Sequence, residues 1–185
     1  MMSHWLFQLV LLAVLLAWVV GAYNRMVRLR TAIVSAWEQI VAALVKRSEA
    51  MAAVVDAVRE PLASEAGTLQ ALAEADARQR AAADGVRQAR ARIADVSLWV
   101  NAEAGLASPA SRLRALIDLQ PALVHESGKG AQLVAALADW REAEPRILFA
   151  RQGFNDAVER YNKAIHQWPT RLIASPLGFR SAGRV

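Results

Sequence analysis

The pattern of hydrophobic and polar positions begins with an apolar run. Residues 5–22, WLFQLVLLAVLLAWVVGA, contain no charged residue, and Gln8 is the one strongly polar side chain. A helix of this length spans about 27 Å, close to the hydrocarbon thickness of a bilayer. The run therefore predicts a transmembrane helix from Trp5 to Ala22.

A cleaved signal peptide is the competing interpretation of this run. The sequence Val20-Gly21-Ala22 offers small residues where a peptidase would need them. However, the preceding MMSH carries no lysine or arginine, whereas three arginines follow the run within residues 23–30. This distribution favours an uncleaved anchor. By the positive-inside rule, it also predicts an outer N-terminus and a cytoplasmic main domain.

Helical periodicity resumes directly after the apolar run. Apolar residues recur at spacings of three and four up to about Glu60, which predicts one helix that ends before Pro61. The stripe comprises Met26, Ile33, Trp37, Ile40, Leu44, Met51, Val54 and Val58, with Arg30 and Arg47 at two of its positions.

Residues 62–104 are rich in Ala, Arg, Gln and Glu and are also predicted to be helical. Their apolar phase persists across Asp84-Gly85, so they form either one long helix or two helices with a break there. GLASPAS predicts a break, after which Pro109 opens a short helix to about Gln120. VHESGKG is predicted to be a loop.

The last predicted helix runs from about Ala131 to Trp168. Pro145 is expected to kink this helix or to leave one carbonyl without a partner. Its stripe alternates spacings of four and three, which is typical of a bundle seam. The stripe is Leu133, Leu137, Trp140, Glu144, Ile147, Arg151, Phe154, Val158, Tyr161, Ile165 and Trp168.

Two charged residues, Glu144 and Arg151, stand on this seam. If the first and last helices are antiparallel, Glu144 lies near Lys46 or Arg47. We expect an ion pair of Glu144 with Arg47 that fixes the helix register. We also expect a cation–π contact between Arg151 and Trp37. In the alternative interpretation, both charged side chains point outward into solvent.

Composition supports the helical prediction and limits the chemistry. The 185 residues are 55% hydrophobic, with 9 glycines and 6 prolines, which favours an all-α fold with one domain. The absence of cysteine excludes disulfides and thiolate metal sites. The three histidines lack metal-site spacing, and no residues form a nucleophile–base pattern. The sequence therefore predicts no metal, cofactor, small-molecule substrate or catalytic residue.

The net charge of +5 is concentrated at two ends of the chain. Seven basic residues in acid-free stretches exceed the net charge: Arg25, Arg28, Arg30, Lys163, Arg171, Arg180 and Arg184. This placement predicts contact with an anionic leaflet. Nucleic acid is not predicted, because no aromatic residues interleave with the arginines of residues 62–104. The expected lipid contacts are Arg25, Arg28, Arg30, Arg171, Leu172, Ile173, Leu177, Phe179 and Arg180.

Both ends of the predicted bundle carry Tyr-Asn followed by a basic residue, in YNRMVRLR and YNKAIHQW. Antiparallel helices would bring these pairs together at the membrane surface, where aromatic residues are favoured. The asparagines stand one position off the seam, where they could bond neighbouring helices or headgroups. The predicted interaction girdle is Tyr23, Asn24, Asn155, Tyr161, Asn162 and Trp168, the expected surface for an unidentified membrane-associated protein.

Two longer stretches carry a specific order of residues. The first is YNRMVRLRTAIVSAWEQI, and the second is PRILFARQGFNDAVERYNKAIHQWP, followed by LGF at residues 177–179. In the order and spacing of the residues in these stretches, the chain resembles the LemA family of bacterial membrane-anchored proteins. It departs from the family pattern at Val41, where Asp is usual, and at Ala52-Ala53, where Pro-Asn is usual.

The resemblance implies a transmembrane helix followed by an antiparallel up-and-down four-helix bundle with no established catalytic activity. The expected segments are the anchor at 1–22, the bundle at 23–168 and a basic, apolar membrane-proximal tail at 169–185. The expected role is a non-enzymatic, single-pass inner-membrane protein that binds proteins or lipids as a scaffold. The alternative is a periplasm-facing envelope-stress or protease-partner module of the same architecture.

Overall fold

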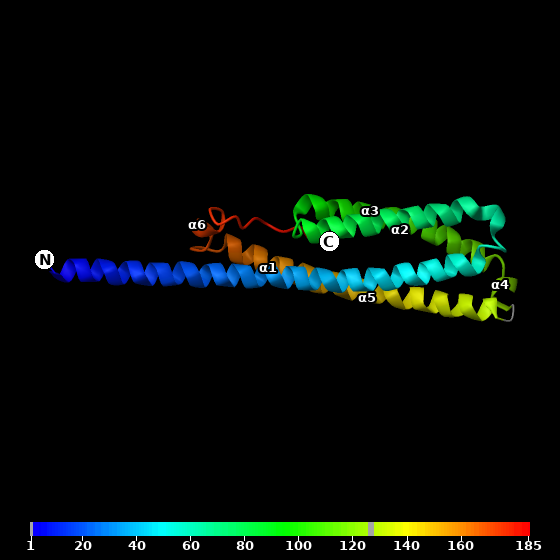
Figure 1. Ribbon diagram of the computed structural model, residues 1–185, viewed down its shortest axis with the longest axis horizontal. Coiled ribbons are helices and arrows are strands. Elements are labelled where there is room, and N and C mark those ends of the chain that lie inside the picture. Colours follow the sequence, from blue (N-terminus) through cyan, green and yellow to red (C-terminus); the bar gives the residue numbers. More distant parts are fainter. Residues whose placement is uncertain (1, 126–127) are drawn as a thin grey trace.

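The computed structural model describes residues 2–125 and 128–185 (Figure 1). Every regular element in these residues is a helix, which confirms the all-α prediction. The four long helices are α1 (Met2–Val58), α2 (Ala66–Gln88), α3 (Ile93–Asp118) and α5 (Lys129–His166). The short elements are η1 (Ala63–Glu65), α4 (Ala122–His125) and α6 (Arg171–Ala174).

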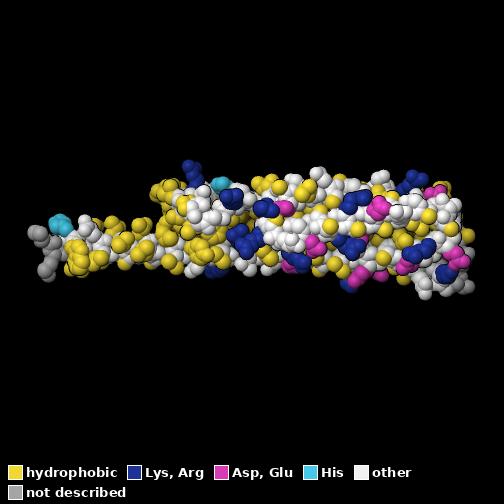
Figure 2. Space-filling view, turned by 45° about the horizontal axis from the view of Figure 1, so that its top comes forward, with side chains coloured by type: hydrophobic (Ala, Val, Ile, Leu, Met, Phe, Trp, Pro, Cys, Tyr) yellow, Lys and Arg dark blue, Asp and Glu magenta, His cyan; other side chains and the backbone are white. Residues whose placement is uncertain are grey.

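The apolar run and the first bundle stripe form one continuous helix, α1. At 1.5 Å per residue, its 57 residues extend about 86 Å. Its N-terminal part projects beyond the other helices, and Figure 2 shows this part covered by hydrophobic side chains. Trp5, Phe7 and Leu11 are among the exposed residues there. By length and composition, α1 is suited to cross a membrane.

The long helices pack in two pairs. α1 packs mainly against α5, and α2 packs mainly against α3. The α1–α5 pair extends past the turn that joins α2 to α3 (Figure 1). α6 and the chain after it cover this extension, because Ala174, Phe179 and Ala182 are buried in the same cluster as Met26 and Ile165. The tail therefore completes the core where α2 and α3 end.

The core consists of two hydrophobic clusters along the bundle axis. The proximal cluster is the one nearer to the projecting part of α1; on α1 it ends at Leu44, and the distal cluster begins at Ala50. On α5, the distal cluster ends at Trp140 and the proximal cluster begins at Ile147. The two clusters divide at the same height on both helices, and the buried side chain of Arg47 lies between them on α1.

The structure resolves the alternatives for residues 62–104 in favour of two helices. The break lies at residues 89–92 and not at Asp84-Gly85, which stay within α2. At the turn, Arg90 and Ala91 have positive φ values of 53° and 59°. This left-handed conformation is strained for residues other than glycine, so the surrounding contacts must hold it.

The predicted break at GLASPAS is wrong, because α3 continues through Pro109 to Asp118. A proline has no N–H to donate to the carbonyl four residues earlier, and its ring crowds that carbonyl. Here the carbonyl belongs to the exposed Gly105, so water can donate the missing hydrogen bond. Burial of Leu106 and Leu113, three residues before and four residues after the proline, stabilises the helix across it. Likewise, α5 runs through Pro145, which lies on an exposed face. Glu126 and Ser127 of the predicted loop lie outside the described residues.

Candidate functional site

A buried ion pair forms the centre of the polar layer between the two clusters. Arg47 on α1 is 3% exposed, and its Nη1 and Nη2 donate to the two carboxylate oxygens of Glu103 at 2.6 and 2.7 Å. Burial alone would lower the pKa of Arg47. The hydrogen bond and charge of Glu103, with the charges of Glu144 and Asp76, outweigh this effect and raise the pKa.

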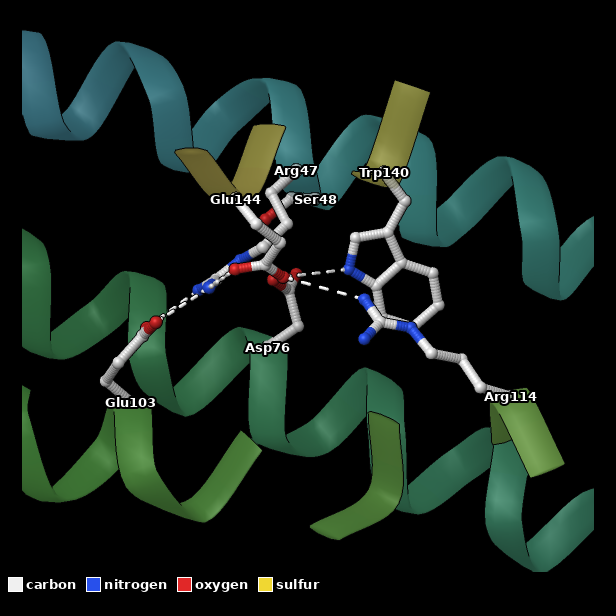
Figure 3. A network of polar contacts seen from close by, with 7 residues as sticks. All are labelled: Arg47, Ser48, Asp76, Glu103, Arg114, Trp140 and Glu144. Carbon is white, nitrogen blue, oxygen red and sulfur yellow. Dashed lines mark hydrogen bonds and ion pairs between the residues drawn. The ribbon is translucent and has the colours of Figure 1, made fainter. Parts of the chain in front are cut away.

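Glu144 on α5 joins this pair from the other side. Its Oε2 lies 3.7 Å from Arg47 Nη1, so the expected contact is present, but Glu103 is the closer partner. Its Oε1 accepts a hydrogen bond from Trp140 Nε1 at 3.2 Å and lies 3.6 Å from Arg114 Nη2. The guanidinium of Arg114 in turn stacks 4.1 Å from the Trp140 ring centroid (Figure 3).

Asp76 connects α2 to the same layer. Ser48 Oγ, next to Arg47 on α1, donates to Asp76 Oδ1 at 2.6 Å. Arg80 Nε lies 2.9 Å from Asp76 Oδ2. The layer thus takes a carboxylate from each of α2, α3 and α5 and places them around the arginine of α1 (Figure 3). We call these residues the polar layer: Arg47, Ser48, Asp76, Arg80, Glu103, Arg114, Trp140 and Glu144.

Sequence reasoning missed Glu103, although a signal for it was present. Trp99, Glu103 and Leu106 follow the spacing of four and three that marks a seam. The supposed break at GLASPAS concealed this continuity.

The expected contact between Trp37 and Arg151 is wrong. Arg151 lies 4.9 Å from the ring centroid of Trp99 on α3. Trp37 instead makes edge contacts with Trp99 and Phe154, both at 5.2 Å, and donates its Nε1 hydrogen to the carbonyl of Ala83. The α5 residue opposite Trp37 is therefore about one helical turn beyond the expected one.

Two of the three asparagines of the predicted girdle bind the chain's own C-terminal residues. Asn162 donates to the carbonyl of Ala182 at 3.0 Å and accepts from the Ala182 amide at 2.9 Å. Asn155 makes the same two bonds with Val185, at 2.8 and 2.9 Å. Each carboxamide therefore pairs with one backbone residue as a neighbouring strand would.

The spacing of these asparagines fits an extended chain. Asn155 and Asn162 lie two turns apart on α5, a rise of about 10.5 Å. Ala182 and Val185 lie three residues apart, which in extended conformation is about 10 Å. The tail, residues 179–185, can therefore run antiparallel to α5 with both pairs of hydrogen bonds satisfied.

Further contacts hold the tail on three sides. Tyr161 Oη donates to the carbonyl of Arg180 at 2.9 Å, and His166 Nε2 lies 2.9 Å from Ser181 Oγ. The Gly183 amide donates to the carbonyl of Ala91 at 3.0 Å, which helps to hold the strained turn. Residue 182 also forms an antiparallel bridge with Arg92. We call Ala91, Arg92, Asn155, Tyr161, Asn162 and His166 the tail cradle.

Burial of Tyr161 raises the pKa of its hydroxyl, and the charge of Arg30 together with the hydrogen bond to Arg180 offsets part of this shift. The hydroxyl stays protonated at neutral pH, so it remains a donor to the tail backbone.

Several expected lipid contacts lie elsewhere. Phe179 is buried, with its ring centroid 5.7 Å from that of Tyr23, so it packs against α1 and not against lipid. Ile173 is half-buried against the proximal cluster. Leu172 and Leu177 remain exposed, as do Arg25, Arg28, Arg171 and Arg180, whereas Arg30 is half-buried.

The predicted girdle is therefore divided between two roles. Asn155, Tyr161 and Asn162 are occupied by the tail and do not form a free interaction surface. Asn24 and Trp168 are exposed, and Tyr23 is partly covered by Phe179. Residues 169–185 are likewise not wholly a surface segment, because Ala174, Phe179 and Ala182 are buried in the core.

Replacing Arg47 by Met should destabilise the bundle by about 3 kcal/mol, because the Glu103 side chain, which is only 14% exposed, loses its partner. The additional substitution Glu103→Leu should restore most of the loss. Glu144→Gln, at a half-exposed carboxylate, should change stability by less than about 1 kcal/mol. Chemical denaturation in detergent, followed by circular dichroism, measures these differences. Equal losses for Arg47→Met and Glu144→Gln would contradict the assigned roles.

The double substitution Asn155→Leu/Asn162→Leu should release the tail, because it removes four hydrogen bonds worth about 1 kcal/mol each. Hydrogen exchange of residues 180–185 should accelerate roughly 10-fold or more, with helix content unchanged. Asn24→Leu, at an exposed asparagine on α1, is the matched control and should have no effect. Unchanged exchange in the double variant would show that other contacts suffice.

A comparison with protein-family models matches residues 36–184 to the LemA family. A search of curated proteins finds no match. The matched residues include the polar layer and the tail cradle, and they cover most of the chain. The resemblance seen in the sequence is thereby confirmed, and the protein belongs to the LemA family.

Proposed function

We propose that the protein is a non-enzymatic, single-pass inner-membrane protein whose antiparallel up-and-down four-helix bundle serves as an interaction module. The observation that carries this proposal is the continuity of α1. The same helix holds the exposed apolar residues of the projecting part and the buried Met26, Trp37 and Arg47 of the bundle. An anchor joined to the bundle without a hinge would hold the bundle at a defined height above the bilayer.

A second proposed membrane contact agrees with the same role. Trp168, Leu172 and Leu177, in the segment that follows α5, are 77%, 65% and 43% exposed, and we call these three residues the membrane foot. The foot lies near the start of the bundle, because Phe179, two residues after Leu177, contacts Tyr23 just beyond the apolar run. Exposed aromatic and aliphatic side chains beside arginines favour the headgroup zone.

The polar residues also support a non-enzymatic role. In the polar layer, Arg47 and Glu103 neutralise each other and join helices. In the cradle, Asn155 and Asn162 use their carboxamides to bind the tail backbone. These side chains are engaged in holding the molecule together, so the interactions with other molecules are assigned to the exposed surface near the membrane.

The positive-inside rule supports a cytoplasmic bundle. Arg25 and Arg28 are exposed directly after the apolar run, whereas the residues before it carry no lysine or arginine. Arg171 and Arg180 add exposed positive charge beside the foot, and each such charge contributes about 1 kcal/mol at an anionic leaflet. The partners proposed are membrane lipids and a membrane-associated protein.

A single cysteine reports the depth of the foot, because the native chain contains none. Nitroxide-labelled Leu172→Cys, in the full chain reconstituted in anionic liposomes, should collide more often with oxygen than with a polar nickel reagent. Leu119→Cys, at a comparably exposed leucine directly after α3, should show the opposite preference. Equal aqueous accessibility at both positions would exclude the second membrane contact.

The same Leu119→Cys chain tests the orientation. A membrane-impermeant maleimide should leave it unlabelled in cells whose outer membrane alone is permeabilised, because the bundle would lie in the cytoplasm. Labelling should appear once the inner membrane is disrupted. Labelling before disruption would instead support the periplasm-facing alternative.

A further inference from the structure

The tail is bound in the manner of a peptide ligand. The hydrogen bonds from Asn155 and Asn162 go to its backbone and not to its side chains. Extended peptides bind to sheet edges through the same pairing of donors and acceptors. Here two carboxamides on one face of α5 take the place of the strand edge.

The fit of the side chains makes the cradle selective for this sequence. A Cβ atom on Gly183 would lie 2.9 Å from Ile93 Cα and 3.0 Å from Val96 Cβ, so a larger residue would collide with α3. Ala182 and Phe179 are both buried. The occupant must therefore carry an aromatic residue followed three positions later by a small residue and glycine. The chain's own tail, FRSAGRV, has this sequence.

The connection to the tail is long and mostly exposed. Residues 167–178 link the end of α5 to Phe179, and Ala174 is the one buried side chain among them. Fully extended, this segment would span roughly 40 Å. Two packed helices are only about 20 Å across. The segment is therefore long enough to carry the tail to a neighbouring bundle.

We propose that the tail is exchanged between copies, so that residues 179–185 of one chain occupy the tail cradle of a second copy and the reverse. Each cradle then receives the same contacts that it has with its own tail, so exchange requires no new complementary surface. A reciprocal exchange closes into a two-fold dimer.

Membrane anchoring favours this occupant over an unrelated peptide. The inference rests on the proposed anchor, which would hold all copies in one orientation. The contact of Phe179 with Tyr23 places every cradle at the same distance from the apolar run. Neighbouring tails would therefore meet neighbouring cradles at the correct height and at high local concentration.

The test uses the absence of native cysteine and the proximity of His166 Nε2 to Ser181 Oγ, 2.9 Å apart. Two full-length chains with different tags are expressed in one membrane, one carrying His166→Cys and the other Ser181→Cys. A short bifunctional thiol reagent is added to the membranes. Exchange should produce a covalent pair that contains both tags.

Two control variants distinguish exchange from random collision. Gly183→Val in the Ser181→Cys chain should lower the yield of the linked pair about tenfold, because overpacking against α3 displaces the tail. Asn155→Leu/Asn162→Leu in the His166→Cys chain should lower it similarly. Circular dichroism of each variant checks that the helices remain.

A chain that carries both cysteines shows whether the reagent bridges a docked tail. If this chain links internally while differently tagged chains give no more product than the Gly183→Val control, each tail stays in its own cradle and the proposal is overturned. A different result, recovery of the chain outside the membrane fraction, would contradict the proposed anchoring. The two proposals are therefore tested separately.

Discussion

The buried guanidinium of Arg47 is the constraint on which the arrangement of the helices depends. A charge that is 3% exposed must be matched inside the bundle, and the carboxylates that match it come from α2, α3 and α5. Helices that slid by one turn would separate Arg47 from Glu103, since both oxygens of that carboxylate are engaged. Hydrophobic clusters on either side tolerate such shifts more easily, so the polar layer fixes the register.

The register set at the polar layer determines which residues of α5 face the core and the tail about three turns further along the helix. With Glu144 beside Arg47, Phe154 lies against Trp37, and the adjacent Asn155 faces the tail. The next turns place Tyr161 in the core and Asn162 on the tail. Each aromatic–asparagine pair therefore makes two kinds of contact. The aromatic side chain, Phe154 or Tyr161, packs in the core, and the carboxamide of the following asparagine binds the extended tail.

Periodicity predicted most of the helices and the buried face of α5 from Leu133 to Ile165, because burial repeats every three or four residues there, but it wrongly extended that face to the exposed Trp168. It could not predict Glu103 as the partner of Arg47, since that contact depends on how α3 is placed across the bundle. Pro109 misled the prediction because a local rule was outweighed by burial of Leu106 and Leu113. The tail was predicted to contact lipid because an irregular segment has no periodicity that reveals its inner face.

The polar layer and the tail cradle differ in how easily they separate. Opening the polar layer would strand charges in a nonpolar interior, so the four helices stay together. The cradle contacts Ala182 and Val185 through neutral amides of half-buried asparagines, so its opening strands no charge and costs about 1 kcal/mol for each hydrogen bond that water replaces. The tail is therefore the part of the bundle that can leave without unfolding the rest. Because Phe179 rests on Tyr23, its departure would uncover apolar surface where α1 emerges from the proposed membrane span.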